Sequence, residues 1–222
     1  MAAKKFYAVK TGKVTGIFNN WGDCKASVEG FPGAQYRGFV SLAEAREYLG
    51  LTEEVNAQAT DKGAEDSLLA YVDGSYDDSL KKYAFGCVFI LPDGRIYTEF
   101  GNGDNEKSLQ HRNVTGEMLG AMYAVKTAMM SGFCRVEIRY DYQGIEKWVT
   151  GEWRSKTELT QVYARSMREW GQRIAISFTK VAAHSKVYYN EMADKLAKQG
   201  LVEGCGVPKV RKVEELTLLE EA

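Results

Sequence analysis

Short runs of alternating apolar and polar residues occupy the first fifty positions of the chain. Their periods predict three strands and two helices, in the order strand, strand, helix, strand, helix. The predicted elements span residues 6–9, 15–18, 21–28, 35–39 and 42–49. Asn20 or Asp23 is the expected cap of the first helix, and Ser41 and Glu44 form a capping box for the second. We expect a compact ββαβα unit around one small core.

Longer apolar runs begin after residue 66 and predict an α/β domain. Three consecutive strands separated by turns are expected to form an antiparallel meander, and two further strands alternate with helices. The predicted strands span residues 68–73, 83–91, 95–101, 135–141 and 174–181. The predicted helices span residues 114–130, 143–149 and 159–170, with a last helix that Asn190 caps and Gly200 ends. This order favours a mixed five-stranded sheet with flanking helices.

Two further segments complete the domain organisation. The first, residues 51–66, contains five acidic residues, one basic residue and almost no large apolar side chains, which is typical of a flexible linker. The second is a tail with apolar residues at Val210, Val213, Leu216 and Leu219. That spacing fits a short amphipathic helix, and a disordered tail is the alternative. The predicted divisions are residues 1–50, 51–66, 67–201 and 202–222, the last of unknown role.

Composition narrows the class of protein. With 222 residues, of which 45% are hydrophobic, the chain can bury a sizeable core, and no apolar run approaches a membrane-spanning length. No apolar stretch follows the N-terminal lysines, so we expect no signal peptide and a cytoplasmic protein. Four widely spaced cysteines and two histidines argue against a zinc site and against disulfides. The net charge of −1 conceals two mildly basic blocks, 1–50 and 67–200, which leaves nucleic acid open as a partner.

Four acidic residues occupy positions where carboxylates can converge on one side of a sheet. Asp73 and Asp141 end predicted strands, whereas Glu117 and Asp194 lie near the starts of predicted helices. Clustered carboxylates repel one another unless a cation neutralises them, and oxygen-only ligands suit Mg²⁺ or Mn²⁺ better than zinc. Two such ions would activate water and stabilise the leaving oxygen of a phosphodiester. With 30 acidic residues in the chain, solvated acids or helix caps remain the alternative from spacing alone.

The first block, from Phe6 to Leu49, resembles a known nucleic-acid-binding module. The matching residues are Phe6-Tyr-Ala-Val9, Gly16-Ile-Phe18, Trp21, Cys24, Val28, Phe31-Pro-Gly-Ala34, Tyr36 and Phe39. They are similar to the hybrid-binding domain at the N-terminus of many type 1 ribonucleases H, a module that also occurs in the caulimovirus inclusion-body protein. The resemblance implies that aromatic residues contact the DNA strand and that basic residues near Arg37 contact the RNA strand. The three aromatic residues at the matching positions are Tyr7, Trp21 and Tyr36. From the residues alone, the alternative is that these three side chains fill a small core.

The second block resembles the catalytic domain of type 1 ribonuclease H from Leu68 to Leu201. Four motifs occur in the family's order: Tyr71-Val-Asp-Gly-Ser75, Asn113-Val-Thr-Gly-Glu-Met-Leu-Gly-Ala121, Tyr140-Asp-Tyr-Gln143, and His184 followed by Asn190-Glu-Met-Ala-Asp-Lys-Leu-Ala197. The resemblance implies a ribonuclease H-like fold. It also implies that four acids bind two Mg²⁺ ions, with Mn²⁺ as the other candidate metal. These acids are Asp73, Glu117, Asp141 and Asp194.

The same resemblance implies roles for residues around the acids. His184, ten residues before Asp194, matches a mobile loop histidine that transfers protons and assists product release. Asn113 and Gln143 match positions that contact the minor groove of the hybrid, where the 2′-hydroxyl distinguishes RNA from DNA. The backbone around Gly74 and Ser75 matches another such contact.

The chain also departs from its relatives in the second block. Arg112 stands where relatives often have Thr, so we expect the phosphate contacts there to be built differently. The stretch 148–158 has only Arg154 and Lys156 as basic residues, so a long basic protrusion that helps some relatives hold substrate is absent. The N-terminal module is expected to supply that grip. His111 is expected to be a solvated loop residue.

The resemblance implies an endonuclease that cleaves the RNA strand of an RNA–DNA hybrid and leaves 3′-hydroxyl and 5′-phosphate ends. Such an enzyme would act as a monomer in the removal of primers and R-loop RNA. One alternative is a non-catalytic hybrid-binding protein, which the loss of any of the four acids would have favoured. Another is a different nuclease of the same fold, such as a transposase or resolvase. The motif at residues 71–75 and the N-terminal module argue against that second alternative.

Overall fold

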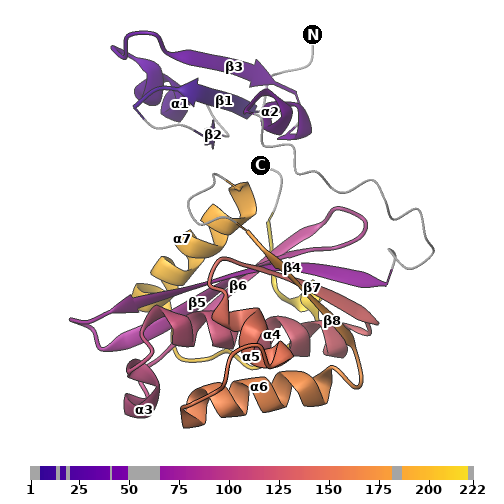
Figure 1. Cartoon of the computed structure of the whole chain (residues 1–222). Coiled ribbons are helices and arrows are strands. Elements are labelled where there is room, and N and C mark those ends of the chain that lie inside the picture. Colours follow the sequence, from indigo (N-terminus) through magenta and orange to yellow (C-terminus); the bar gives the residue numbers. More distant parts are fainter. Residues whose placement is uncertain are drawn as a thin grey trace. The chain divides into compact units, whose positions relative to one another are not determined.

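The computed structural model of the chain describes residues 6–13, 16–18, 21–40, 42–49, 66–181 and 187–219. These residues form two compact units, one within residues 6–49 and one within residues 66–219. In Figure 1 the first unit is indigo to violet and the second runs from magenta to yellow. Several predicted features lie outside the described residues, namely Asn20, Ser41, residues 51–65 of the linker and His184.

The small unit is a three-stranded antiparallel sheet with one helix on each face (Figure 1). Its elements are β1 (Phe6–Thr11), β2 (Gly16–Phe18), α1 (Trp21–Val28), β3 (Gln35–Phe39) and α2 (Leu42–Leu49), and the sheet order is β2-β1-β3. Alternate residues of β1 point to opposite faces, so Phe6 and Ala8 pack toward α2 while Val9 packs with Cys24 of α1. The predicted order of elements is confirmed. The expectation of a single core was wrong, because the sheet buries a small cluster on each face.

The large unit is built on a six-stranded mixed sheet in the order β8-β7-β4-β5-β6-β9. Its strands are β4 (Ser67–Asp77), β5 (Lys82–Ile90), β6 (Ile96–Gly103), β7 (Arg135–Tyr140), β8 (Ala175–Lys180) and β9 (Thr217–Leu218). Its helices are α3 (Glu106–Leu109), α4 (Asn113–Ser131), α5 (Gly144–Thr150), α6 (Glu158–Trp170), α7 (Tyr188–Glu203) and a short 3₁₀ turn (Val213–Glu215). β4, β5 and β6 form the predicted antiparallel meander, and β7 and β8 run parallel to β4.

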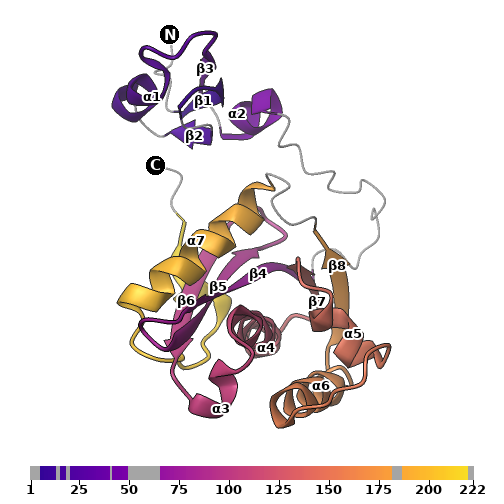
Figure 2. The same cartoon turned by 60° about the vertical axis from the view of Figure 1, so that its left-hand side comes forward.

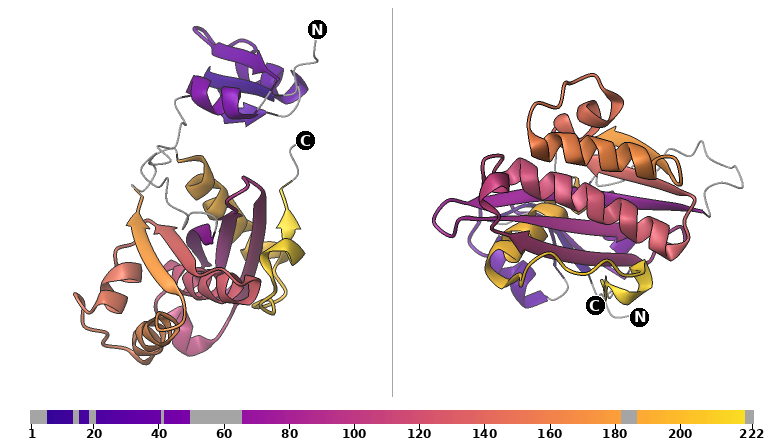
Figure 3. Two further views of the ribbon diagram at one scale, coloured as in Figure 1. Left: turned by 90° about the vertical axis from the view of Figure 1, so that its right-hand side faces the viewer. Right: turned by 90° about the horizontal axis from the view of Figure 1, so that it is seen from below.

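Helices cover both faces of this sheet. Figure 2 shows α7 on one face and α4 on the other, and the right-hand view of Figure 3 shows α4 and α6 side by side across their face. The larger apolar cluster lies under α4 and includes Leu68, Phe85 and Ile138, and a smaller one under α7 includes Tyr71 and Tyr189. Across the described ranges, every helix is too short or too polar to traverse a bilayer. The expected α/β architecture is confirmed, with β9 as an additional edge strand.

The boundaries of two predicted elements were wrong. Asp73 does not end its strand, because the residues from Gly74 to Asp77 continue to pair with β5. The last helix begins two residues before Asn190 and continues past Gly200 to Glu203. Gly200 lies inside the helix, and the residue is glycine because space is short there: a Cβ would come within 3.2 Å of the Gly101 carbonyl oxygen. A glycine interpreted as a helix stop is therefore a point of close packing between α7 and the sheet.

The described part of the tail wraps around β6 and ends in the edge strand β9. Val213 and Leu216 are buried in the cluster on the α4 face, whereas Leu219 packs against the cluster on the α7 face. The Asn102 side chain on β6 hydrogen-bonds three backbone groups within residues 200–206. β9 then pairs antiparallel with β6. Neither a helix nor disorder is correct for this segment, because its apolar side chains divide between the two faces of the sheet.

Candidate active site

Two of the four predicted acids lie at matching positions on neighbouring parallel strands. β4 and β7 pair from Ser67 opposite Arg135 to Tyr71 opposite Arg139. Asp73 and Asp141 each lie two residues beyond that last pair, so both strands deliver a carboxylate at the place where their pairing ends. Asp73 stays fixed within β4 because it still pairs with β5 on its other side. The sheet register therefore brings these two side chains together.

The third acid, Glu117, reaches the same place because α4 lies unusually close to the sheet. A Cβ added to Gly74 would lie 2.1 Å from the Asn113 carbonyl oxygen, and one added to Gly116 would lie 1.9 Å from the Ala84 carbonyl oxygen. Both distances are far below van der Waals contact, so any larger residue at either position would push α4 away from β4 and β5. Glycine at these two positions lets the first turn of α4 place Glu117 beside Asp73.

The structure joins three of the predicted acids in one cluster. Carboxylate oxygens of Asp73, Glu117 and Asp141 all lie within 4.8 Å of one another. Glu117 is 1% exposed, and its Oε2 atom is buried without a hydrogen-bond partner. A buried carboxylate oxygen without a donor is costly in free energy, so this atom is the clearest sign that the cluster is shaped for a cation.

Electrostatics at the cluster follow from burial and mutual repulsion. Burial raises the pKa of Asp73 to about 7, and the charge of Asp141 adds to the shift even though the Gly74 amide donates a hydrogen bond to Asp73. Burial also raises the pKa of Glu117 well above its ordinary value, with further contributions from Asp141 and Asp73. Without a cation, Asp73 therefore binds a proton near neutral pH. Among the described residues the cluster offers carboxylate oxygens alone, and such ligands suit a hard divalent ion.

The fourth predicted acid, Asp194, lies near this cluster but outside it. Its carboxylate accepts a hydrogen bond from the Lys198 ammonium at 2.7 Å, one turn further along α7. Its charge nevertheless contributes to raising the pKa of Asp73, which places it within electrostatic reach. Lys198 was not singled out in the sequence, although a lysine four residues after an acid on a helix is a recognisable signal for an ion pair.

The predicted substrate-contacting residues surround the acids. Gly74 and Ser75 follow Asp73 on β4, Gln143 precedes α5, and Asn113 begins α4 one turn before Glu117. Asn113 and Gln143 are exposed, as groups that contact a ligand must be.

Arg112 occupies a strained position immediately before α4. Its backbone φ is +51°, in the left-handed region that few residues other than glycine adopt. Its guanidinium lies over the Tyr76 ring, 5.7 Å from the ring centroid. Arg112 therefore projects toward the β4–β5 hairpin, next to the cluster that α4 and β4 share.

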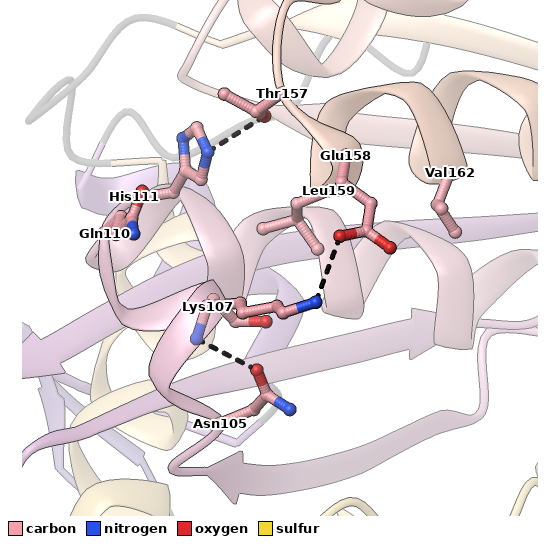
Figure 4. Close-up of a pocket in the computed structure, with 9 residues that line it drawn as sticks. Asn105, Lys107, Gln110, His111, Thr157, Glu158, Leu159 and Val162 are labelled. Atoms are coloured by element: carbon pink, nitrogen blue, oxygen red, sulfur yellow. Dashed lines mark hydrogen bonds and ion pairs between the residues drawn. The ribbon is translucent and has the colours of Figure 1, made fainter.

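A pocket of about 520 Å³ lies between α3 and the start of α6 (Figure 4). His111 lines it and is half-buried, with its Nε2 atom 3.0 Å from the Thr157 hydroxyl. Lys107 forms an ion pair with Glu158 at 3.4 Å across the same opening. His111 lies in a turn, as expected of a loop residue, but its ring is half-buried rather than fully solvated. Its partner Thr157, which also caps α6, is 46 residues further along the chain, so no local sequence pattern indicates the contact.

An aromatic surface characterises the small unit. The ring centroids of Tyr7 and Trp21 lie 5.4 Å apart, and those of Trp21 and Tyr36 lie 5.7 Å apart. Trp21 and Tyr36 are each 44% exposed, so the alternative that these two side chains fill the core was wrong. Arg37 points to the α2 face of the sheet, where it lies over Phe39. It can share a ligand with the aromatic surface only if that ligand reaches around β3.

Comparisons with known proteins agree with both units. Residues 5–49 match the ribonuclease H1 N-terminal domain family, and residues 65–202 match the RNase H family. Ribonuclease H1 of Homo sapiens is 31% identical over 253 aligned positions that cover 88% of each chain. Ribonuclease H1 of Rattus norvegicus is 26% identical, again with 88% of each chain covered.

Solved structures support the same fold. RNase H1 from the halophilic archaeon Halobacterium salinarum NRC-1 superposes with a TM-score of 0.52 and 27% identity, covering 61% of this chain and 97% of that one. The match therefore falls on a region about the size of the large unit. Because the RNase H family match alone spans more than half of the chain, the protein belongs to the ribonuclease H family and is a type 1 ribonuclease H with an N-terminal hybrid-binding domain.

Proposed function

We propose that this ribonuclease H hydrolyses the RNA strand of RNA–DNA hybrids by two-metal catalysis and leaves 3′-hydroxyl and 5′-phosphate ends. The observation that carries the proposal is the cluster of Asp73, Glu117 and Asp141, within 4.8 Å of one another inside the matched RNase H region. Removal of primers and R-loop RNA by a monomer is the corresponding cellular role. Retention of all four acids argues against a non-catalytic binding protein.

The metal ligands in this proposal are the three clustered acids together with Asp194. Their fit to Mg²⁺ rests on the oxygen-only donor set and on the buried Oε2 atom of Glu117, which has no partner. Two divalent ions bound there would lower the pKa of an attacking water and stabilise the leaving oxygen. Asp194 would exchange its ion pair with Lys198 for the metal. Mn²⁺ is compatible with the same ligands.

Other residues of the large unit would bind and orient the hybrid. Asn113, Gln143 and the backbone at Gly74 and Ser75 lie beside the acids, where they can contact 2′-hydroxyls of the RNA strand and so exclude duplex DNA. Arg112 would contact a phosphate from its position above Tyr76. His184, ten residues before Asp194, is proposed to move a proton at the leaving oxygen and to assist product release.

The small unit would hold the hybrid through its aromatic surface. Exposed rings can stack on sugars and bases without reading the sequence, which suits an enzyme that accepts any hybrid. Tyr7, Trp21 and Tyr36 offer three adjacent rings for the DNA strand. Arg37 would add a phosphate contact from the other side of β3.

A cleavage assay on three labelled duplexes tests this proposal. The full chain with Mg²⁺ is expected to cut the RNA strand of a hybrid and to leave duplex RNA and duplex DNA intact. The fragments should support primer extension, which requires a 3′-hydroxyl. The Asp73→Asn variant and an EDTA-treated sample are the controls. Binding of the hybrid without cleavage would favour the non-catalytic alternative, and cleavage of duplex DNA would favour another nuclease of this fold.

A further inference from the structure

Three elements that carry the proposed metal ligands meet in one group of side chains on the α7 face of the sheet. The group consists of Tyr71 on β4, Arg139 on β7 and Tyr189 on α7, and we refer to it as the brace. Tyr71 lies two residues before Asp73, Arg139 lies two residues before Asp141, and Tyr189 lies five residues before Asp194. Asp73, Asp141 and Asp194 are thus each within five residues of one member of the brace.

The contacts within the brace are close and largely buried. The Arg139 guanidinium donates a hydrogen bond to the Tyr71 hydroxyl, and it also lies over the Tyr71 ring, 5.2 Å from the centroid. Glu137, two residues earlier on β7, accepts a hydrogen bond from Arg139 at 3.0 Å and neutralises its charge. The Tyr189 ring packs on the Tyr71 ring with a centroid separation of 5.5 Å. Tyr71 is fully buried, so these contacts leave little freedom for either ring.

The brace lies where the pairing between β4 and β7 ends. Tyr71 and Arg139 are the last paired residues of the β4–β7 ladder, and beyond them the strands part to present Asp73 and Asp141. No backbone pairing between the two strands restrains their separation past this point. A side-chain link at the last pair therefore limits how far the two acids can move relative to each other.

The start of α7 depends on the same group. The residue before the helix, Val187, makes no side-chain cap hydrogen bond, so this residue does not restrain the first turn. Tyr189 in that turn packs instead on Tyr71, and Tyr188 packs edge-on against Tyr189. This packing on β4 restrains the first turn of α7, and the close approach of α7 to Gly86 of β5 at Ala193 restrains the helix next to Asp194.

We propose that the brace positions Asp194 relative to Asp73 and Asp141, so that Tyr71, Arg139 and Tyr189 act as positioning residues for hybrid cleavage. The inference rests on the proposed function, since it concerns the ligands of that site. None of the three residues touches the reacting atoms. Loosening the brace should reduce turnover and weaken metal binding while leaving hybrid affinity unchanged, because the hybrid contacts lie elsewhere.

A matched pair of substitutions tests the proposal. Tyr189→Leu removes a ring of the brace, and Tyr97→Leu removes a ring at the far edge of the sheet. Both tyrosines are 5% exposed, so the two variants should lose comparable packing and comparable melting temperature. For Tyr189→Leu, measured well below its melting temperature, we expect kcat to fall roughly ten-fold with KM kept within about two-fold, because small displacements of catalytic groups are costly. Tyr97→Leu should keep kcat within about two-fold.

A metal-binding measurement separates this proposal from the proposed function. Titration of each full-length variant with Mn²⁺, followed by electron paramagnetic resonance, should show weaker binding for Tyr189→Leu and unchanged binding for Tyr97→Leu. If the wild-type protein cleaves no hybrid, the proposed function fails, and the Mn²⁺ titration still tests the brace. Equal losses of kcat and equal Mn²⁺ affinities in the two variants would overturn it.

Milder substitutions guard against a variant that does not fold. Tyr71→Phe keeps the ring contact with Tyr189 and removes only the hydroxyl that accepts from Arg139. We expect a two- to five-fold lower kcat with a melting temperature lowered by only a few degrees, on the scale of one lost hydrogen bond. Tyr189→Trp, which restores an aromatic ring, should recover most of the activity that Tyr189→Leu loses. An unchanged kcat for Tyr71→Phe together with no recovery by Tyr189→Trp would contradict the brace.

Discussion

The two units of this ribonuclease H place their functional groups in opposite environments. The small unit leaves its aromatic rings at the surface, where Trp21 and Tyr36 are each 44% exposed. The large unit withdraws its carboxylates from solvent: Glu117 is only 1% exposed, Asp73 and Asp141 are half-buried, and burial raises the pKa of Asp73 to about 7. Exposed rings cost the fold little, whereas buried like charges destabilise it until a cation binds. Changes in the small unit should therefore alter affinity, and changes in the acid cluster should alter both turnover and stability.

The largest effect is expected from Asp73→Asn. The amide keeps the shape of the side chain but removes a charge that the metal ions require, so cleavage should fall by at least about 10³-fold. Hybrid binding should persist, because phosphate, 2′-hydroxyl and stacking contacts lie outside the cluster. Single-turnover cleavage and a binding titration on the same hybrid measure the two quantities. Substantial Mg²⁺-dependent cleavage by this variant would show that the metal site has been misplaced.

The buried cluster should also make stability depend on pH in the metal-free protein. The pKa of Asp73 is about 7 in the folded chain against an ordinary value of 3.8, so the folded state holds the proton more tightly. This contribution to stability is complete below pH 4 and is lost as the pH rises through 7. With EDTA present, the free energy of unfolding should fall by on the order of 1–3 kcal/mol between pH 5 and pH 8.

Thermal or denaturant unfolding at the two pH values measures that difference. Mg²⁺ should restore stability at pH 8 and have little effect at pH 5, because protons compete with the metal for the same oxygens. Asp73→Asn should flatten the dependence and raise the melting temperature of the metal-free protein at pH 8. A metal-free wild-type protein that is more stable at pH 8 than at pH 5 would contradict this account of the cluster.

His184→Ala should slow turnover without abolishing it. A positioned general acid or base contributes on the order of 10²–10⁴-fold. We expect His184 at the lower end of that range, because the family histidine that it matches lies on a mobile loop. We expect a loss of roughly 100-fold in kcat with hybrid affinity little changed. Rates measured between pH 6 and pH 9 should show the wild-type dependence weakened in the variant. Identical profiles for the two proteins would reduce His184 to an ordinary loop residue.

The sequence predicted the ordered elements well where local pattern and final environment agree. Buried strands of the meander read as apolar runs because both faces of the sheet are covered by helices. The end of β4 was misjudged, because pairing with β5 rather than local hydrophobicity carries the strand past Asp73. Gly200 was misjudged for a similar reason, since its role depends on the distant Gly101. Boundaries set by a partner far along the chain are invisible to a local pattern.

In the candidate site, too, the features that a local pattern indicates differ from those that depend on distant parts of the chain. Spacing alone left solvated acids or helix caps as an alternative, and the resemblance of four motifs to type 1 ribonuclease H singled out the four acids. Strand register and the close approach of α4 then bring three of them into one cluster. The pairing of Asp194 with Lys198 and the contact between His111 and Thr157 depend on where side chains point after folding. The tail shows this most clearly. Apolar residues three positions apart are compatible with a helix, and they are equally compatible with an extended segment that packs Val213 and Leu219 on opposite faces of the sheet.

Removal of residues 1–66 should alter affinity and leave chemistry intact. All four acids, and the brace that links three of their elements, lie in the large unit, so residues 67–222 should fold and cut alone. The missing small unit carries a net charge of +3 within residues 1–50 and the three adjacent rings. Its loss should raise KM on a long hybrid roughly ten-fold through the lost local concentration, with kcat on a saturating short hybrid kept.

The salt dependence of affinity provides a second comparison between the full chain and residues 67–222. The intact chain neutralises more phosphates, so its affinity should fall more steeply with rising salt than that of residues 67–222. Steady-state cleavage by both proteins at two salt concentrations determines KM and the slope together. Equal KM values and equal slopes would mean that the small unit does not bind the substrate, and its likeness to the ribonuclease H1 N-terminal domain would then be structural only.

The smallest effect is expected from Trp21→Ala in the full chain. Trp21 is the central ring of the aromatic surface, in contact with both Tyr7 and Tyr36, so its loss separates the other two rings. Base stacking on an aromatic ring is worth about 1–3 kcal/mol, and the remaining contacts of both units dilute it, so KM should rise roughly three- to five-fold. The melting temperature should barely change because the side chain is largely exposed. Val40→Ala, at a 51% exposed apolar residue outside the aromatic surface, is the matched control and should leave KM unchanged. Equal KM values for the two variants would mean that Trp21, although exposed, contributes no more to substrate binding than an exposed apolar side chain outside the aromatic surface.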